Sequence, residues 1–231
     1  MSNAPRIWVT QTVPRAYDSA KAFEALGLEP VVSPLLSVVM HDEYISKPIK
    51  DSCLIFTARN GVRAFAEKHS ERDFPVITVG SATAELARNY GFEDVQSADG
   101  TALDVIDLIA KKYSKSTQIR HCSGRHVRGR IVERLLKKGY NAERVEYYAS
   151  KPVTHYDIDL AEISYVTFYS PLGADTFAKL YSQNETGQLK ALSISLATDK
   201  ALCGINFKKK LIADTPNQAA MLAKLRLDLQ D

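Results

Sequence analysis

Two stretches of the sequence, CLIFTARNGVRAF (Cys53–Phe65) and YVTFYSPLGADTF (Tyr165–Phe177), repeat one another. Phe56, Gly61 and Phe65 each match a residue of the same type 112 positions later, and further matches on both sides keep offsets of 112 to 115. This period is far longer than that of a solenoid repeat, so it predicts a duplicated domain. Two similar halves usually form two similar lobes, and we expect a ligand-binding cleft between them.

The composition is that of an ordinary globular protein, with 231 residues of which 45% are hydrophobic and 25% are charged. No apolar run approaches the roughly 18 residues that a membrane span needs, and the N-terminal residues show no secretion-signal pattern. The three cysteines, Cys53, Cys122 and Cys203, have no CxxC spacing. These features predict a cytoplasmic location, and they argue against a disulfide framework or a cysteine-rich metal site.

Positive charge is concentrated between Arg120 and Lys151, where nine Lys and Arg residues stand against three Glu residues. Such a segment can be the solvated face of a helix, and it can equally attract an anionic ligand. Nucleic acid ranks lower, because aromatic side chains are not interleaved with the basic run. Within this basic segment, Arg128 is a candidate ligand contact.

Short apolar runs alternate with helical patterns along the whole chain, which is typical of parallel α/β units. One helix is predicted over Arg125–Lys138, ended by Gly139 in the left-handed conformation. Another is predicted over Pro216–Leu229, and Thr215 before it has the right chemistry to cap that helix.

Small polar residues recur where the predicted strands end. In a parallel α/β sheet, ligands bind where the carboxyl ends of strands lead into helix N-termini, because free N–H groups and the helix dipole favour anions there. Any single hydroxyl at such a point is more often an ordinary helix cap. Their repetition across both halves favours a ligand with many negative groups. The candidate contacts are Thr10, Thr57, Asn60, Ser81, Thr101, Ser123, Gly124, Tyr169, Ser170, Thr198 and Thr215.

Several other kinds of site lack support in the sequence. Gly124–Gly129 has the GxxxxG spacing of a phosphate-binding loop, but the Lys and Ser or Thr of that motif do not follow. No GxGxxG follows the first strand and no GxSxG is present. His121, Cys122 and His126 cluster without zinc-ligand spacing. We therefore expect no metal site, and neither dinucleotide binding nor acyl transfer is supported.

Tyr147 and Tyr148 close a predicted strand, where one of the two side chains must point away from the core. A phenol at a strand end can simply cover the sheet, which is the usual role of an arbitrary tyrosine. Because this strand end is expected to meet the cleft, general-acid catalysis is the alternative interpretation.

The sequence resembles the uroporphyrinogen-III synthases over essentially its whole length. Four short stretches carry the resemblance, and their order and spacing together are more specific than any one of them. The stretches are Ile55–Val62, Val79–Ala84, Cys122–Tyr148, and Phe168–Gly173 followed by Ala213–Pro216.

The resemblance implies an α/β fold of two flavodoxin-like lobes, each a parallel sheet flanked by helices, joined by a two-stranded linker. It places residues 1–37 and 153–231 in the first lobe and residues 38–152 in the second. Polar connectors at Ser37–Pro48 and Ser150–Tyr156 stand at equivalent positions in the two halves, and they are natural places for the chain to pass between lobes.

The implied activity is that of a cyclising hydro-lyase of tetrapyrrole biosynthesis. Such an enzyme closes linear hydroxymethylbilane with loss of water and inversion of the last pyrrole ring, giving uroporphyrinogen III. The substrate carries eight carboxylates, which suit the candidate loops and the basic segment. Because the bilane closes spontaneously without inversion, the protein must chiefly control conformation. The resemblance implies no cofactor and no metal, and it suggests a monomer.

The resemblance also implies roles for individual residues. Tyr148 matches the family's best-known catalytic candidate and is expected to help protonate the departing hydroxyl. The hydroxyl residues of the loops match positions expected to hold carboxylates, many through backbone N–H groups. Two positions depart from the family pattern: Thr57-Ala58 stands where Thr-Ser is common, and Ser195 stands where glycine is common.

Two other functions fit parts of the pattern. A non-catalytic, two-lobed binding protein or sensor for a small polyanion would carry the same duplicated lobes and loops, but it would not need a phenol facing the cleft. A sugar-phosphate enzyme would concentrate an acid–base pair at one loop, and the sequence shows none. We therefore favour the synthase, with a small-molecule substrate and with no nucleic-acid or membrane partner.

Overall fold

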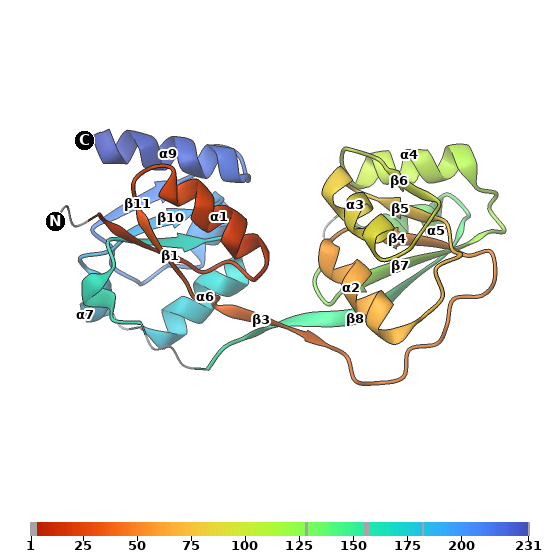
Figure 1. Ribbon diagram of the computed structural model, residues 1–231, viewed down its shortest axis with the longest axis horizontal. Helices are drawn as coiled ribbons and strands as arrows, with labels where there is room; N and C mark the ends of the chain where they lie inside the picture. Colours follow the sequence, from red (N-terminus) through yellow and green to blue (C-terminus); the bar gives the residue numbers. More distant parts are fainter. Residues whose placement is uncertain (1–3, 128, 155–157, 182, 231) are drawn as a thin grey trace. The chain divides into compact units, whose positions relative to one another are not determined.

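The structure is a computed structural model that describes residues 4–127, 129–154, 158–181 and 183–230. The chain divides into two compact units: unit 1 combines Met1–Ser37 with Lys151–Asp231, and unit 2 is Val38–Ser150. Each unit is built on its own sheet, and helices cover both faces of that sheet (Figure 1). The predicted α/β class with two helix-flanked parallel sheets is confirmed.

The sheet of unit 1 contains five parallel strands in the order β11-β10-β9-β1-β2. Successive residues of β1 point to opposite faces: Val9 packs with α1 and α9, whereas Trp8 packs against the face that carries α6. The strands are β1 (Arg6–Val9), β2 (Glu29–Val32), β9 (Tyr165–Phe168), β10 (Lys190–Ser193) and β11 (Lys209–Ile212). The helices are α1 (Arg15–Glu24), the 3-10 helix η1 (Leu160–Glu162), α6 (Pro171–Leu180), α7 (Gln183–Thr186), α8 (Leu196–Lys200) and α9 (Gln218–Gln230).

The sheet of unit 2 has the strand order β3-β8-β7-β4-β5-β6. Its central strand β4 is apolar throughout because both faces are buried: Phe56 packs with α2 and α3, and Ile55 packs with α4 and α5. The strands are β3 (Leu36–Met40), β4 (Cys53–Phe56), β5 (Val76–Thr78), β6 (Val95–Ser97), β7 (Gln118–Gly124) and β8 (Asn141–Pro152). The helices are α2 (Arg59–Lys68), α3 (Ser81–Asn89), α4 (Ala102–Lys112) and α5 (Ile131–Lys137).

Strands β3 and β8 carry the chain from one unit to the other. The division between the units falls inside both strands, after Ser37 in β3 and after Ser150 in β8. The two strands are neighbours in the sheet, and Ser37 Oγ donates to the carbonyl of Lys151 at 3.4 Å. The connection is therefore a two-stranded linker, as predicted. The segment Ser37–Pro48, predicted as a polar connector, begins as a strand because its first residues pair with β8.

Helix α5 is shorter than the sequence predicts. It starts at Ile131 rather than at Arg125, because Gly129 and Arg130 before it have positive φ values of 85° and 48°, which a right-handed helix cannot contain. The predicted end of this helix is confirmed, since Gly139 has a φ of 83° and lies just after the last turn. Residues 125–127, 129 and 130, between β7 and α5, therefore lie outside regular secondary structure.

Helix α9 also starts later than predicted, at Gln218 rather than at Pro216. Asn217 takes the capping role, since its Oδ1 accepts a hydrogen bond from the backbone N–H of Ala220 at 2.9 Å. The Thr215 hydroxyl instead accepts a bond from the Asn217 side chain at 3.0 Å. The predicted capping role of Thr215 is therefore wrong, because an Asx residue two positions later competes successfully for the helix end.

Candidate functional site

Tyr148 lies on β8 with its ring against the backbone of Gly124, the last residue of β7. A Cβ atom at position 124 would stand only 2.6 Å from Cε2 of Tyr148, so glycine is what leaves room for the ring. The side chain is half-buried, and burial raises the pKa of its phenol above the ordinary value. The phenol is therefore protonated at neutral pH, which a proton donor requires.

An irregularity in strand pairing sets the position of Tyr148. Ser123 of β7 pairs with Glu146, and the next residue, Gly124, pairs with Tyr148, so Tyr147 is an extra residue in β8. Such a bulge re-aims the side chains that follow it and is common beside active sites. Tyr147 is fully buried, whereas Tyr148 keeps part of its surface exposed. Of the two tyrosines, Tyr148 is the one that a ligand can reach.

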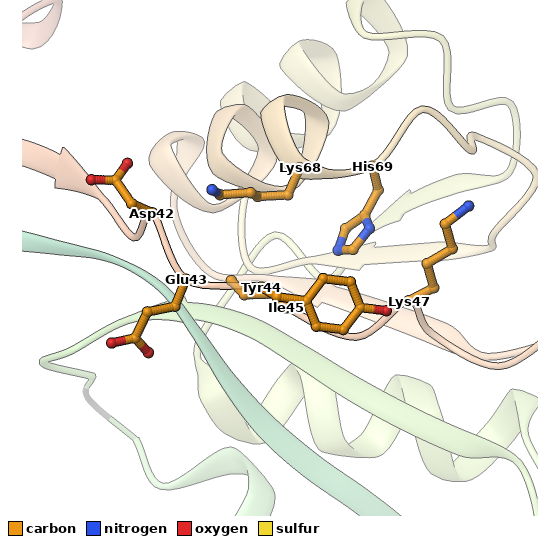
Figure 2. A pocket seen from close by; sticks show the side chains of 7 residues that line it. All are labelled: Asp42, Glu43, Tyr44, Ile45, Lys47, Lys68 and His69. Carbon is orange, nitrogen blue, oxygen red and sulfur yellow. The ribbon is translucent and has the colours of Figure 1, made fainter.

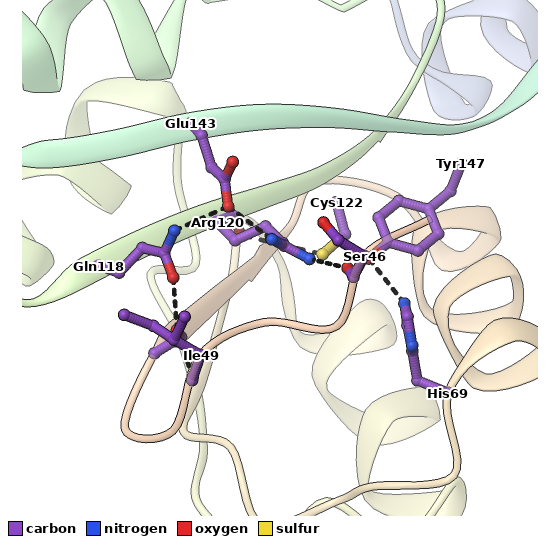
Figure 3. A network of polar contacts seen from close by, with 9 residues as sticks. Ser46, Ile49, His69, Gln118, Arg120, Cys122, Glu143 and Tyr147 are labelled. Atoms are coloured by element: carbon purple, nitrogen blue, oxygen red, sulfur yellow. Dashed lines mark hydrogen bonds and ion pairs between the residues drawn. The ribbon is translucent and has the colours of Figure 1, made fainter. Parts of the chain in front are cut away.

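The buried Tyr147 belongs to a polar network inside unit 2 (Figure 3). Its hydroxyl lies 3.2 Å from Nε2 of His69. In the same network Arg120 donates from Nε to Glu143 at 2.7 Å and from a terminal nitrogen to the carbonyl of Ser46. Although Arg120 belongs to the basic segment of the sequence, its side chain is only 4% exposed. This arginine therefore fixes the loop before β4 and is not available to a ligand.

Thr57, at the carboxyl end of β4, is coupled to a buried histidine. Its Oγ1 lies 3.1 Å from Nε2 of His121 on β7. Burial, reinforced by the charge of Arg144, lowers the pKa of His121 to about 4. His121 is therefore neutral at physiological pH, and the hydroxyl of Thr57 is held by an uncharged imidazole.

We expect this buried histidine to make unit 2 sensitive to acid. In the unfolded chain the imidazole binds a proton below its ordinary pKa of 6.5, whereas in the folded protein it resists protonation until about pH 4. The free energy of unfolding should therefore fall as the pH is lowered from 6.5 towards 4, by about 1 kcal/mol between pH 7 and pH 5.5. Urea unfolding at the two pH values measures this change.

The control for the acid prediction compares two histidine variants. His121→Asn should make the pH dependence flatter by the same amount, whatever its effect on stability at pH 7. His126→Asn makes the same substitution at an exposed histidine in the segment after β7 and controls for the change of side chain itself. Equal pH dependence in the wild type and in His121→Asn would contradict the prediction.

Three predicted hydroxyl contacts participate in helix capping. Thr101 caps α4 in a capping box, where its hydroxyl accepts from the N–H of Leu103 and Asp104 accepts from the N–H of Thr101. Ser170 caps α6 by a single bond, with its Oγ accepting from the N–H of Gly173 at 3.1 Å. Thr198 is buried in the first turn of α8, where the hydroxyl of Ser195 is the cap. These bonds fix where the helices start.

The remaining candidates of unit 2 lie at three strand ends. Ser81 is exposed at the first position of α3, and its side chain does not cap that helix. Asn60 lies in the first turn of α2 and accepts a bond from Arg63 at 3.1 Å. Ser123 is buried, and its hydroxyl donates to the carbonyl of Gly124 at 3.1 Å.

The remaining candidates of unit 1 differ in exposure. Thr10 is buried, and its hydroxyl donates to the carbonyl of Thr167 on the neighbouring strand. Tyr169 follows β9, and burial raises the pKa of its phenol. Thr215 is exposed between β11 and α9. Arg128 lies outside the residues that the structure describes.

The candidate residues thus form one set in each unit, near the carboxyl ends of the parallel strands. The structure adds Arg125, Glu146 and His41 to the set of unit 2, because Nε of Arg125 and Nε2 of His41 both contact one oxygen of Glu146, at 2.9 and 2.7 Å. In the sequence, Arg125 and Glu146 were visible only as part of a charged segment. No local pattern relates either of them to His41.

A separate cavity of about 340 Å³ lies between the loop 42–47 and the end of α2 (Figure 2). The side chains of Lys68 and His69 extend from the helix end, and Tyr44 and Lys47 come from the loop. None of the predicted site residues lines this cavity. Among the described residues, no group of three His, Cys, Asp or Glu side chains could hold a metal ion, and no helix is long and apolar enough to cross a membrane.

One comparison with known proteins identifies a family, and another identifies structures with the same fold. The model of the family described as uroporphyrinogen-III synthase HemD matches residues 18–223. A crystal structure of uroporphyrinogen-III synthetase from Helicobacter pylori 26695 is 18% identical over 98% of this chain and 99% of that one, with a TM-score of 0.67. A mutant uroporphyrinogen III synthase from the extreme thermophile Thermus thermophilus is 16% identical over 98% and 99% of the two chains, with a TM-score of 0.52. No match to the chain was found among curated protein sequences.

Proposed function

Because this chain belongs to the uroporphyrinogen-III synthase family, we propose that its substrate is linear hydroxymethylbilane, which it closes to uroporphyrinogen III. The observation that carries this proposal is the family match over residues 18–223. The reaction expels the terminal hydroxyl as water and inverts the last pyrrole ring through a spiro intermediate. One water is lost overall, because the proton that the leaving hydroxyl takes up is balanced by a proton released from a pyrrole carbon on closure.

Tyr148 is the proton donor in this proposal. Its phenol is protonated at neutral pH, and the bulge at Tyr147 together with the missing side chain of Gly124 holds its ring at the end of β8. A weak acid suits this step, since the substrate needs a proton only as the hydroxyl departs. Which isomer forms then depends on the conformation in which the bilane is held, and in this proposal the strand ends hold it.

In this proposal each predicted lobe, residues 1–37 with 153–231 and residues 38–152, offers carboxylate contacts at its own strand ends. Helix N-termini favour anions there through free N–H groups and the helix dipole. Thr101, Ser170 and Thr198 support this indirectly, because their local bonds fix where the helices start. Ser81 is exposed at its helix terminus and is a direct contact in this proposal.

The test is an assay that starts from enzymatically generated hydroxymethylbilane and separates type I from type III uroporphyrin after oxidation. We expect mainly the type III isomer, formed faster than the spontaneous closure to type I. If folded protein yields only type I at the spontaneous rate, the chain is a binding protein for a polyanion instead. The proposal places a monomer in the cytosol, where its three free cysteines would stay reduced, and light scattering of the purified protein tests the monomer.

A further inference from the structure

Arg125 is exposed, yet it is held more firmly than an ordinary surface arginine. It directly follows Gly124, against which the ring of Tyr148 packs. Its backbone N–H donates to the carbonyl of Tyr148 at 2.9 Å, and its own carbonyl accepts from Arg144 at 3.0 Å. The backbone of this residue is therefore fixed on both sides, next to the proposed proton donor.

The guanidinium of Arg125 is also held, but only along one edge. Its Nε donates to Oε1 of Glu146 at 2.9 Å, and Nε2 of His41 lies 2.7 Å from the same oxygen. Glu146 is one-quarter exposed, and the pKa of its carboxyl is lowered by Arg125 and His41 in spite of burial. The carboxylate that orients Arg125 therefore stays ionised at neutral pH and is fixed from a second direction.

The other edge of the guanidinium is open. An arginine has five N–H donors, of which the bond to Glu146 uses one. Within the described part of the chain, the two terminal nitrogens of Arg125 make no hydrogen bond to protein, and the side chain is 56% exposed. Two parallel N–H groups on one edge match the two oxygens of a carboxylate.

We propose that Arg125 binds a carboxylate of the substrate through its two terminal nitrogens and that Glu146 positions it for this contact. This inference rests on the proposed substrate. Glu146 balances the charge of Arg125, so the gain in binding affinity does not come from net charge. It comes from geometry, because the open edge of the guanidinium is oriented before the ligand arrives. Arg144 supports the arrangement by donating to the carbonyls of Gly124 and Arg125, which fixes the backbone that carries the Arg125 side chain.

The test compares four variants in the type III isomer assay and in direct titration with uroporphyrin III, the oxidised product, followed by its fluorescence. Arg125→Gln should raise KM and the Kd for uroporphyrin III by about tenfold, the usual effect of losing a charge-assisted bond, and should leave kcat within about threefold. Arg125→Lys should recover little, because one ammonium cannot bond Glu146 and a carboxylate along two fixed edges. Glu146→Gln should give a smaller rise in KM.

Arg134→Gln is the matched control, since Arg134 is an exposed arginine of the same basic segment on α5. It should leave KM and Kd unchanged, which separates a specific contact from general attraction of an anion. If the wild type makes the type III isomer and Arg125→Gln keeps the wild-type KM and Kd, this inference is wrong and the proposed function stands. If the wild type makes no type III isomer, the proposed function itself has failed.

Discussion

Tyr148→Phe should slow formation of the type III isomer by about 10²–10⁴-fold, the usual effect of removing a general acid, and the protein should fold as before. The substitution removes only the hydroxyl, and the ring can still pack against Gly124. The effect should fall on kcat, since the proton is needed in the transition state rather than for binding. The measurement is the rate of type III formation at saturating bilane, with circular dichroism to establish folding.

Tyr147→Phe is the matched control for the catalytic prediction. It removes the neighbouring hydroxyl, which is fully buried and lies 3.2 Å from Nε2 of His69. We expect a loss of about 1 kcal/mol of stability with turnover close to that of the wild type. Gly124→Ala adds a second test, because its Cβ would displace the ring of Tyr148 and should lower kcat although the phenol remains. A wild-type turnover in Tyr148→Phe would refute the assigned role.

Gly61→Ala should destabilise unit 2 by about 1–3 kcal/mol, the usual cost of overpacking a core. Gly61 lies in the first turn of α2, and an added Cβ would stand 2.7 Å from the carbonyl oxygen of Cys122 and 3.3 Å from Cδ1 of Phe56. The nearer atom is backbone of the adjacent strand β7, so α2 would have to move away from the sheet. Urea unfolding of the full chain, followed by circular dichroism, measures the loss.

The duplicated sequence supplies the control for the stability prediction. Gly173 occupies the equivalent third position of α6, but the nearest atom to its added Cβ is Oγ of Ser170 at 3.4 Å, which is ordinary contact. Gly173→Ala should therefore be neutral or slightly stabilising, since alanine favours a helix by about 1 kcal/mol over glycine. If the two substitutions change the free energy of unfolding equally, then the close approach of α2 to β7 is not the reason that position 61 needs a glycine.

The comparison of these two glycines shows what the sequence can and cannot predict about the fold. The apolar runs around Phe56 and Phe168 predicted strands, and their repetition predicted two similar sheets, because alternating α/β patterns depend on local periodicity. The sequence could not reveal that the same glycine is tightly packed in one half only. That difference depends on how closely a helix approaches a strand that is distant in sequence.

The candidate site also has features that the sequence could predict and features that it could not. The strand ends were predictable, because a change from apolar run to small polar residue marks them, and Tyr148 was singled out at one of them. The role of each individual hydroxyl could not be predicted. Thr101 and Ser81 occupy similar positions in the sequence, yet Thr101 closes a capping box and Ser81 is exposed at the start of its helix. Glu146 and His41 could not be paired, because His41 directly follows the strand β3 and both residues 37–40 of that strand and His41 were predicted as part of a connector.

The order of strands in unit 1 has a consequence for how the chain folds as it is synthesised. Unit 2 is one continuous segment, so its sheet can form as soon as residue 150 has emerged. β1 cannot complete its pairing so early, because it lies between β2 and β9 in the sheet. Its residue Val9 pairs with Thr167 of β9, which is synthesised much later. Until then Trp8 and its apolar neighbours remain uncovered beside a finished unit 2. The nascent N-terminal segment therefore leaves apolar surface and a strand edge unpaired for longer than unit 2 does, which favours aggregation or chaperone binding.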